Sequence, residues 1–304
     1  MNSLENGCLS VTPLHQIYYE TYGNKNGVPL LCFHGGPGGG FSTRYLDMIN
    51  LDKFYVIFFD QRGCGKSIPD AEILDNTCQD AVSDAALLLS HLSIKRCVVS
   101  GYSYGSTLAM AFAEQFTEQV LSVYLSSVFI PYDFNSLFFK QHHSLPDAYE
   151  KFINIVRTTE ARELLNEYEK CGFKRKQDIV AAIVNWELEL FQLNNAKFCS
   201  ADDVDNRLIS SKRVFLHYVS NDFFDFGTKV KNNLNKLSGI PITTVQGEND
   251  KITPISVAYG LQKFLPQLRI ISMPDTGHIG RVITKRYYDE VNKLIITENG
   301  VAHG

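Results

Sequence analysis

The sequence lacks the features of membrane, secreted and nucleic-acid-binding proteins. No apolar run among its 304 residues approaches the roughly 20 residues that a membrane helix needs. The segment MNSLENGCLSVTPLHQ has neither the basic nor the apolar region of a secretory signal. The 29 Lys and Arg residues are outnumbered by 33 Asp and Glu residues, so there is no basic excess to bind nucleic acid. We therefore expect neither a membrane nor a nucleic-acid partner.

Cysteine patterns that would indicate a metal site or a disulfide framework are also absent. The seven Cys residues form no C-x-x-C pair and no metal-type spacing, and their odd number cannot pair completely. We expect reduced, mostly buried thiols in a cytoplasmic protein that needs no metal and no cofactor. The oligomeric state does not follow from the sequence.

The sequence does contain strand-like segments that alternate with helix-like ones. Several of the strand-length segments are continuously apolar, as in parallel strands covered by helices on both faces. The expected strands are residues 16–20, 29–33, 54–59, 97–100, 121–126, 242–246 and 268–272. Helices are expected at residues 76–92 and 103–116. This alternation predicts an α/β fold with a mostly parallel central sheet.

The alternation stops between about residues 131 and 236, where long helical, charged and aromatic stretches contain no clear strand. We expect residues 131–236 to form a helical cap above the carboxyl edge of the sheet. Residues 1–130 and 237–304 then form the core domain. The final segment, ENGVAHG, is expected to be frayed.

Gly101-Tyr102-Ser103-Tyr104-Gly105 is a G-x-S-x-G motif between a predicted strand and a predicted helix. A sharp turn at this place strains the serine backbone and exposes its hydroxyl, while the flanking glycines allow close packing. Ser103 is therefore the predicted nucleophile. The alternative is a serine that only caps the helix.

A serine hydroxyl needs a base to take its proton and an acid to orient that base. In α/β hydrolases the acid and then the histidine follow the serine along the chain. Asp250 follows a predicted strand and is the expected acid, with Glu248 as the local alternative. His278 follows the next predicted strand and is the expected base, whereas Asp275 is expected to be a surface turn residue.

Two glycine-rich segments are candidates for anion binding. Residues 34–40 read HGGPGGG, and Phe41 stands where a dinucleotide-binding motif would have its third glycine. We expect an oxyanion loop here, in which the N–H groups of Gly36 and Tyr104 stabilise the tetrahedral intermediate. The segment GCGKS matches the end of a P-loop, but Asp60 occupies the place of its first glycine, so nucleotide binding is not expected.

The chain resembles proline iminopeptidases of the α/β-hydrolase superfamily in HGGPGGG, FFDQRGCGKS, GYSYGSTLAMAFAE, IPITTVQGENDKITP and GH. The resemblance covers most of the first 130 and the last 65 residues. It implies a metal-free serine exopeptidase that releases an N-terminal residue, preferentially proline, from short peptides. It also implies a cis Gly36–Pro37 peptide bond.

The family binds the free α-amine of its substrate through carboxylates of the cap. The resemblance places Trp186 and Glu187 in the cap segment that carries a Trp-Glu pair, which makes Glu187 the amine anchor and Trp186 its substrate-binding neighbour. It places a second carboxylate at Asp225. The alternative is that both acids are solvated surface residues.

The chain also departs from the family. Tyr104 stands where a Trp is usual, Tyr102 replaces a small residue, and LSSVFIPYDF lacks an expected Arg. These departures leave open a hydrolase of small-molecule esters, lactones or amides with a repurposed cap. A ligand-binding protein without activity is disfavoured by the complete set of nucleophile, acid and base. Cys64, in DQRGCGKS, lies near the expected mouth of the site, where it is either reachable by thiol reagents or packed and inert.

Overall fold

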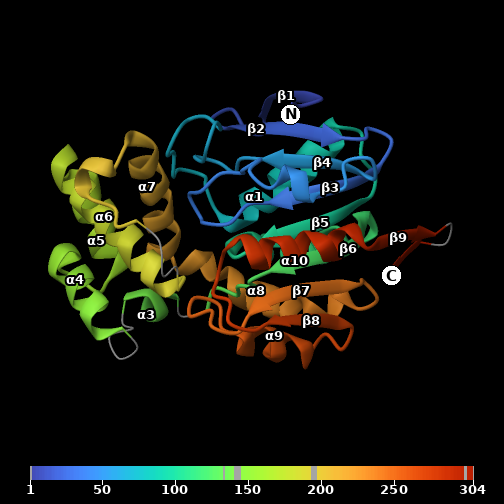
Figure 1. Ribbon diagram of the computed structural model, residues 1–304. Coiled ribbons are helices and arrows are strands. Elements are labelled where there is room, and N and C mark those ends of the chain that lie inside the picture. Colours follow the sequence, from blue (N-terminus) through green and yellow to red (C-terminus); the bar gives the residue numbers. More distant parts are fainter. Residues whose placement is uncertain (1, 133, 140–144, 193–196, 298–299, 304) are drawn as a thin grey trace.

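The computed structural model describes residues 2–132, 134–139, 145–192, 197–297 and 300–303. Its main sheet has eight strands in the order β1-β2-β4-β3-β5-β6-β7-β8 (Figure 1). These strands are β1 Glu5–Ser10, β2 Gln16–Gly23, β3 Val28–Phe33, β4 Phe54–Phe59, β5 Cys97–Tyr102, β6 Val120–Ser126, β7 Ile242–Gly247 and β8 Leu268–Met273. All strands from β3 to β8 are parallel to one another, whereas β2 runs antiparallel to β1 and β4. The predicted α/β fold with a mostly parallel sheet is confirmed.

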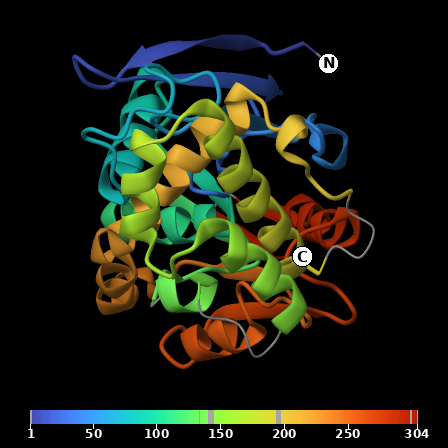
Figure 2. The same ribbon diagram turned by 90° about the vertical axis from the view of Figure 1, so that its left-hand side faces the viewer.

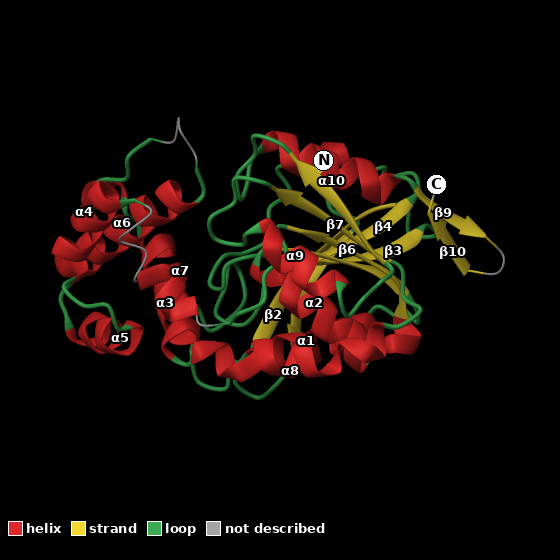
Figure 3. Ribbon diagram, turned by 90° about the horizontal axis from the view of Figure 1, so that it is seen from below, coloured by secondary structure: helices red, strands yellow, loops and turns green. Residues whose placement is uncertain are grey.

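Helices cover both faces of the sheet, with α10 on one face and α1 and α2 on the other (Figure 3). The helices are α1 Cys78–His91, α2 Tyr104–Gln115, α3 Phe134–Phe139, α4 Pro146–Val156, α5 Ala161–Lys170, α6 Phe173–Leu190, α7 Asn206–Ser220, α8 Phe226–Asn233, α9 Ile255–Gln262 and α10 Arg281–Asn292. Among the helices of the described ranges, none combines the length and apolar character that a membrane crossing requires.

Strand β4 shows why a continuous apolar run forms the middle of this fold. All six of its residues, FYVIFF, are buried. Its odd-numbered residues belong to the apolar cluster shared with α1 and α2, and its even-numbered residues belong to the cluster shared with α10. Because successive side chains of a strand point to opposite faces, a strand between two helical layers needs apolar residues at every position.

Helix α1 begins where the sequence provides a cap. The Thr77 side chain accepts a hydrogen bond from the Asp80 N–H, and the Asp80 carboxylate accepts one from the Thr77 N–H. This reciprocal capping box satisfies two backbone donors that the first turn of a helix leaves free. The buried face of α1, which includes Val82, Ala85 and Leu89, packs against the sheet.

All described elements between β6 and β7 are helical. Helices α3 to α7 stand beyond the carboxyl ends of the strands, on the left of Figure 1, and face the viewer in Figure 2. Helix α8 lies within residues 131–236 but packs against α2 of the core. The division into a core domain and a cap at residues 131–236 therefore stays a prediction.

The first strand, β1, and the last two strands, β9 and β10, were not predicted from the sequence. Strand β1 was missed because its six residues alternate between half-buried and exposed positions and form no apolar run. The expectation of a frayed end was wrong for residues 300–303, because β10 Gly300–His303 pairs antiparallel with β9 Leu294–Thr297. Residues 298, 299 and 304 of that segment lie outside the described residues.

Candidate active site

Ser103 lies in the sharp turn between β5 and α2. Its backbone angles, φ 52° and ψ −129°, are rare for any residue other than glycine. A Cβ atom added at Gly101 would lie 2.2 Å from the Gly105 carbonyl oxygen, and one added at Gly105 would lie 2.3 Å from the Phe33 carbonyl oxygen. Glycine is therefore required on both sides of Ser103 for the turn to close.

The structure brings Ser103, His278 and Asp250 together at the carboxyl edge of the sheet. His278 Nε2 lies 2.9 Å from Ser103 Oγ, and His278 Nδ1 lies 2.8 Å from Asp250 Oδ2. Asp250 follows β7 and His278 follows β8, and both side chains are buried. The arrangement allows the ring to accept the serine proton while the carboxylate holds the opposite N–H.

Donors that follow Asp250 in the chain make hydrogen bonds to both of its side-chain oxygens. Its Oδ1 accepts hydrogen bonds from the N–H groups of Ile252 at 2.9 Å and Thr253 at 2.8 Å. The Thr253 hydroxyl donates to Oδ2 at 2.5 Å. Thr253 was not among the predicted site residues, although Asp followed by a donor three residues later is a common local hydrogen-bonding pattern.

Neither neighbouring acid takes part in this group. Glu248 is exposed, and its carboxylate accepts a hydrogen bond from Ser272. Asp275 is exposed in a turn with φ 55°, as expected of a surface turn residue.

The cap also contacts the histidine. The Phe191 ring, just after α6, stacks on the His278 ring with centroids 4.9 Å apart and planes 17° apart. The chain can approach this closely because residue 277 is glycine: a Cβ atom there would lie 2.4 Å from the Phe191 carbonyl oxygen. On the core side, the Ser127 hydroxyl donates to the His278 carbonyl oxygen at 2.6 Å. Neither contact could be predicted from the sequence.

The two predicted oxyanion donors border the nucleophile. Gly36 lines the same cavity as Ser103 and has φ +126°, which favours glycine. Tyr104 is the first residue of α2, where a backbone N–H has no intrahelical acceptor. The Tyr104 ring points away into the core and packs against Tyr218 and Phe223. The Gly36–Pro37 peptide bond is cis, as predicted.

Side chains of the core brace the glycine-rich loop. His34 Nε2 accepts a hydrogen bond from the Gln61 N–H at 3.1 Å, and its Nδ1 donates to the Gly35 carbonyl oxygen at 2.8 Å. Burial lowers the pKa of His34, which agrees with a neutral ring that donates on one side and accepts on the other. Asp60 accepts from the N–H groups of Phe41 and Lys66, each at 2.8 Å. Asp60, which stands where a P-loop would have its first glycine, is thus hydrogen-bonded to both glycine-rich segments.

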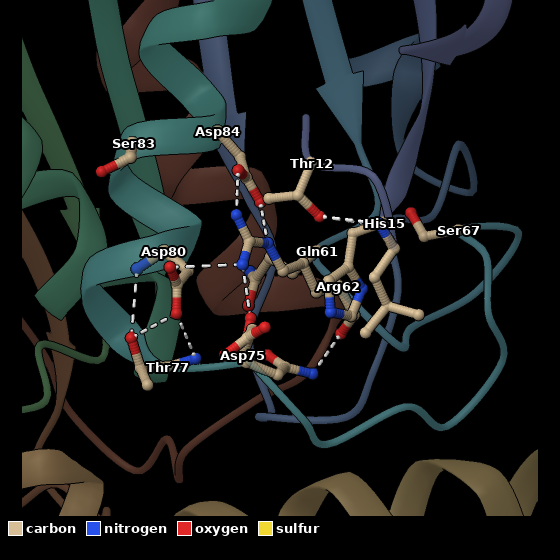
Figure 4. A network of polar contacts seen from close by, with 12 residues as sticks. Thr12, His15, Gln61, Arg62, Ser67, Asp75, Thr77, Asp80, Ser83 and Asp84 are labelled. Atoms are coloured by element: carbon tan, nitrogen blue, oxygen red, sulfur yellow. Dashed lines mark hydrogen bonds and ion pairs between the residues drawn. The ribbon is translucent and has the colours of Figure 1, made fainter. Parts of the chain in front are cut away.

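The DQRG segment is fixed to α1 by a buried ion pair. Arg62 donates through Nε and one terminal nitrogen to the two carboxylate oxygens of Asp84, each at 2.7 Å (Figure 4). Its other terminal nitrogen lies 3.2 Å from Asp80. The Arg62 side chain is 4% exposed and that of Asp84 is 1% exposed. Cys64, in the same segment, is buried, and burial raises the pKa of its thiol, which favours the packed and inert alternative.

A small cavity of about 40 Å³ lies beside Ser103. It is lined by Gly36, Ser103, Phe129, Phe134, Phe138, Glu187, Phe191, Phe215 and Ile252. We call this space the acyl chamber. Its aromatic walls suit a small apolar group, and Glu187 is the only charged residue among the described residues that line it.

Glu187 reaches the chamber as expected, but it is already paired. The Lys212 ammonium, on α7, donates to both carboxylate oxygens of Glu187 at 2.7 and 2.5 Å. Both side chains are largely buried, 10% exposed for Lys212 and 17% for Glu187. Lys212 was not predicted, because it and Glu187 lie on different helices and no local sequence pattern determines how these helices pack.

Trp186 and Asp225, the other two expected substrate-binding residues, do not line the chamber. The Trp186 indole is 1% exposed, donates to the Phe138 carbonyl oxygen at 2.7 Å and stacks on Phe152. Successive helical residues point about 100° apart, so Trp186 faces the cap interior while Glu187 faces the chamber. Asp225 is exposed just before α8. The structure therefore corrects both expectations, with Trp186 in the cap core and Asp225 on the surface.

No group of three or more His, Cys, Asp or Glu residues that could hold a metal ion occurs in the described part of the chain.

Comparisons with known proteins agree with this geometry. A family model described as alpha/beta hydrolase fold matches residues 28–280. A probable proline iminopeptidase of Leptolyngbya boryana is 34% identical over 283 residues, which cover 90% of this chain and 88% of that protein. A proline iminopeptidase of Neisseria meningitidis is 32% identical over 286 residues, with 90% and 89% covered. Among solved structures, a proline iminopeptidase-related protein of Thermus thermophilus matches with a TM-score of 0.59 and 20% identity, with 96% of each chain covered.

Proposed function

The chain belongs to the proline iminopeptidase family of α/β hydrolases, and we propose that it releases an N-terminal residue, preferentially proline, from short peptides through an acyl-enzyme on Ser103. The observation that carries this proposal is the hydrogen-bonded series from Ser103 through His278 to Asp250, which ends beside a small acyl chamber. We also propose a cytoplasmic location, which the seven unpaired cysteines support.

The geometry supports a conventional order of proton transfers. Ser103 Oγ attacks the carbonyl carbon of the N-terminal residue while His278 Nε2 takes its proton. The Asp250 carboxylate holds the Nδ1–H and stabilises the imidazolium. His278 then gives the proton to the leaving amine. A water molecule, activated in the same way, hydrolyses the acyl-enzyme and restores Ser103.

The developing negative charge on the carbonyl oxygen needs donors that are already in place. The N–H groups of Gly36 and Tyr104 take this role, because Gly36 lines the same cavity as Ser103 and Tyr104 follows Ser103 directly at the start of α2. Loss of one such donor typically lowers the rate by about 10²–10³-fold.

The acyl chamber selects a small residue at the N-terminus. Its phenylalanine walls contact the side chain or ring, and the Glu187 carboxylate accepts a hydrogen bond from the substrate amine. Trp186 is buried inside the cap and has no direct contact with the substrate in this proposal. Asp225 has no part in the proposed site.

Steady-state assays of purified protein test the proposal. Proline p-nitroanilide, alanine p-nitroanilide and p-nitrophenyl acetate are compared for the wild type and Ser103→Ala. We expect the highest kcat/KM for the prolyl substrate and loss of all three activities in the variant. Activity that is confined to the ester would support the hydrolase with a repurposed cap instead. Hydrolysis that persists in Ser103→Ala would refute the assignment of the nucleophile.

A further inference from the structure

Lys212 is a largely buried cation next to a site proposed to bind a cationic amine. It lies on α7 with its side chain 10% exposed, and its ammonium is 5.1 Å from the centre of the Phe215 ring that lines the acyl chamber. The preceding residue, Ser211, touches the glycine-rich loop, since a Cβ atom added at Gly38 would lie 2.1 Å from the Ser211 carbonyl oxygen. This close backbone contact fixes the position of Lys212 relative to the oxyanion loop.

The pairing of Lys212 changes the charge of the chamber. Among the described residues, the Lys212 ammonium makes hydrogen bonds only to Glu187, and it contacts both oxygens of that carboxylate. Glu187 supplies the only charge among the described lining residues. The pair therefore carries no net charge, and the acyl chamber lacks the net negative charge that an incoming ammonium would need to offset its loss of water.

A substrate ammonium has to bind a carboxylate that already holds another ammonium. A carboxylate has further lone pairs that can accept a bond. The two cations would nevertheless lie close together in a largely desolvated place, where like charges repel strongly. An uncharged acyl group entering the same aromatic chamber meets no such competition.

We propose that Lys212 is a specificity-determining residue that competes with the substrate ammonium for Glu187. Its charge keeps the enzyme's preference for free-amine substrates low, so the acyl chamber also accepts small acyl groups without an ammonium. The inference rests on the proposed function, because it concerns the residue that neutralises the proposed amine anchor.

Two matched substrates measure this competition. Proline p-nitroanilide and cyclopentanecarboxyl p-nitroanilide have the same ring size and leaving group, but only the first carries an ammonium. The quantity to compare is the amine preference, defined as kcat/KM for the prolyl substrate divided by kcat/KM for the cyclopentane substrate. This ratio reports the difference between the two transition states and cancels general damage to the catalytic group.

Four proteins then vary the charge of the pair: the wild type and the double variant are neutral, Lys212→Met is negative, and Glu187→Gln is positive. We expect the amine preference to rise about 10-fold in Lys212→Met and to fall about 10-fold in Glu187→Gln. The amine preference of the double variant, Lys212→Met/Glu187→Gln, should lie within about threefold of that of the wild type. Lys212→Arg keeps the charge and should keep the wild-type preference.

A second cap lysine provides the control. Lys174 pairs with Asp202 at 3.1 Å on the surface, where both side chains are exposed, so Lys174→Met should leave the amine preference unchanged. An amine preference in Lys212→Met that equals or falls below that of the wild type overturns the inference. If Lys212→Met does not fold, the double variant decides, because removing Lys212 must raise the preference above that of Glu187→Gln. Absence of turnover of both substrates by the wild type would instead refute the proposed function.

Discussion

The buried ion pair between Arg62 and Asp84 holds the DQRG segment beside the active site, and one substitution tests how much this pair contributes to the free energy of unfolding. Arg62→Met keeps an apolar side chain of similar reach but leaves the Asp84 carboxylate 1% exposed without its cation. Removing one partner of a buried ion pair costs about 3–5 kcal/mol, because the remaining charge stays desolvated. The bidentate bonds at 2.7 Å and the further contact with Asp80 place this pair at the upper end of that range.

Arg213 offers a matched control on the cap. It also binds a carboxylate through two nitrogens, at 2.7 and 3.1 Å from Glu169, but its side chain is 29% exposed and that of Glu169 is 38% exposed. Exposed pairs contribute about 0–1 kcal/mol, so Arg213→Met should cost about 1 kcal/mol. Both variants are compared with the wild type by urea unfolding followed by circular dichroism.

The double variant Arg62→Met/Asp84→Leu completes this test. Replacing both charges with apolar groups removes the stranded carboxylate, so we expect the double variant to be more stable than Arg62→Met alone. A loss in Arg62→Met no greater than that in Arg213→Met would refute the reasoning. So would a double variant that is as unstable as the single one.

Three further predictions concern the core. Burial raises the pKa of Glu114 from its ordinary value of 4.5 to about 8, so the folded protein binds more protons than the unfolded chain between these values and loses stability as pH rises. Glu114→Gln should therefore raise the unfolding free energy more at pH 8 than at pH 5, and equal gains at both pH values would contradict this. Gly105→Ala should lower the free energy of unfolding by at least about 3 kcal/mol, because the added Cβ would clash with the Phe33 carbonyl oxygen. Gly260→Ala, which has free space in α9, should raise it by about 0.4–1 kcal/mol. Similar effects of the two substitutions on Tm would contradict the geometry of the turn at Ser103. N-ethylmaleimide should not inactivate the enzyme through the buried Cys64, so inactivation of the wild type but not of Cys64→Ser would contradict the packing.

The strands β2 to β8 of the central sheet could be predicted from the sequence because local patterns determine them, whereas the edge strand β1 lacks such a pattern. The run FYVIFF is apolar at every position and forms a strand between two helical layers. The predicted nucleophile, acid and base come together because the carboxyl ends of parallel strands lie at one edge of a sheet. Their order along the chain and the glycines around Ser103 are visible in the sequence itself.

The substrate-binding side of the site depends on contacts between cap helices, which local patterns do not reveal. Trp186 and Glu187 are neighbours in the sequence, but the helical turn sends one into the cap core and the other into the acyl chamber. Lys212 and Phe191 reach the site only through the packing of α6 and α7. Asp225 was misplaced because spacing along the chain does not determine where an irregular turn between two helices lies.

The most direct test of the account is to identify the residue that carries the acyl group during turnover. The protein is mixed with proline p-nitroanilide, quenched in acid at short times, digested and analysed by mass spectrometry. The account predicts a prolyl group on the peptide that contains Ser103, and neither the adduct nor p-nitroaniline release in Ser103→Ala. Release of p-nitroaniline by Ser103→Ala, or a prolyl group on another residue, would contradict it.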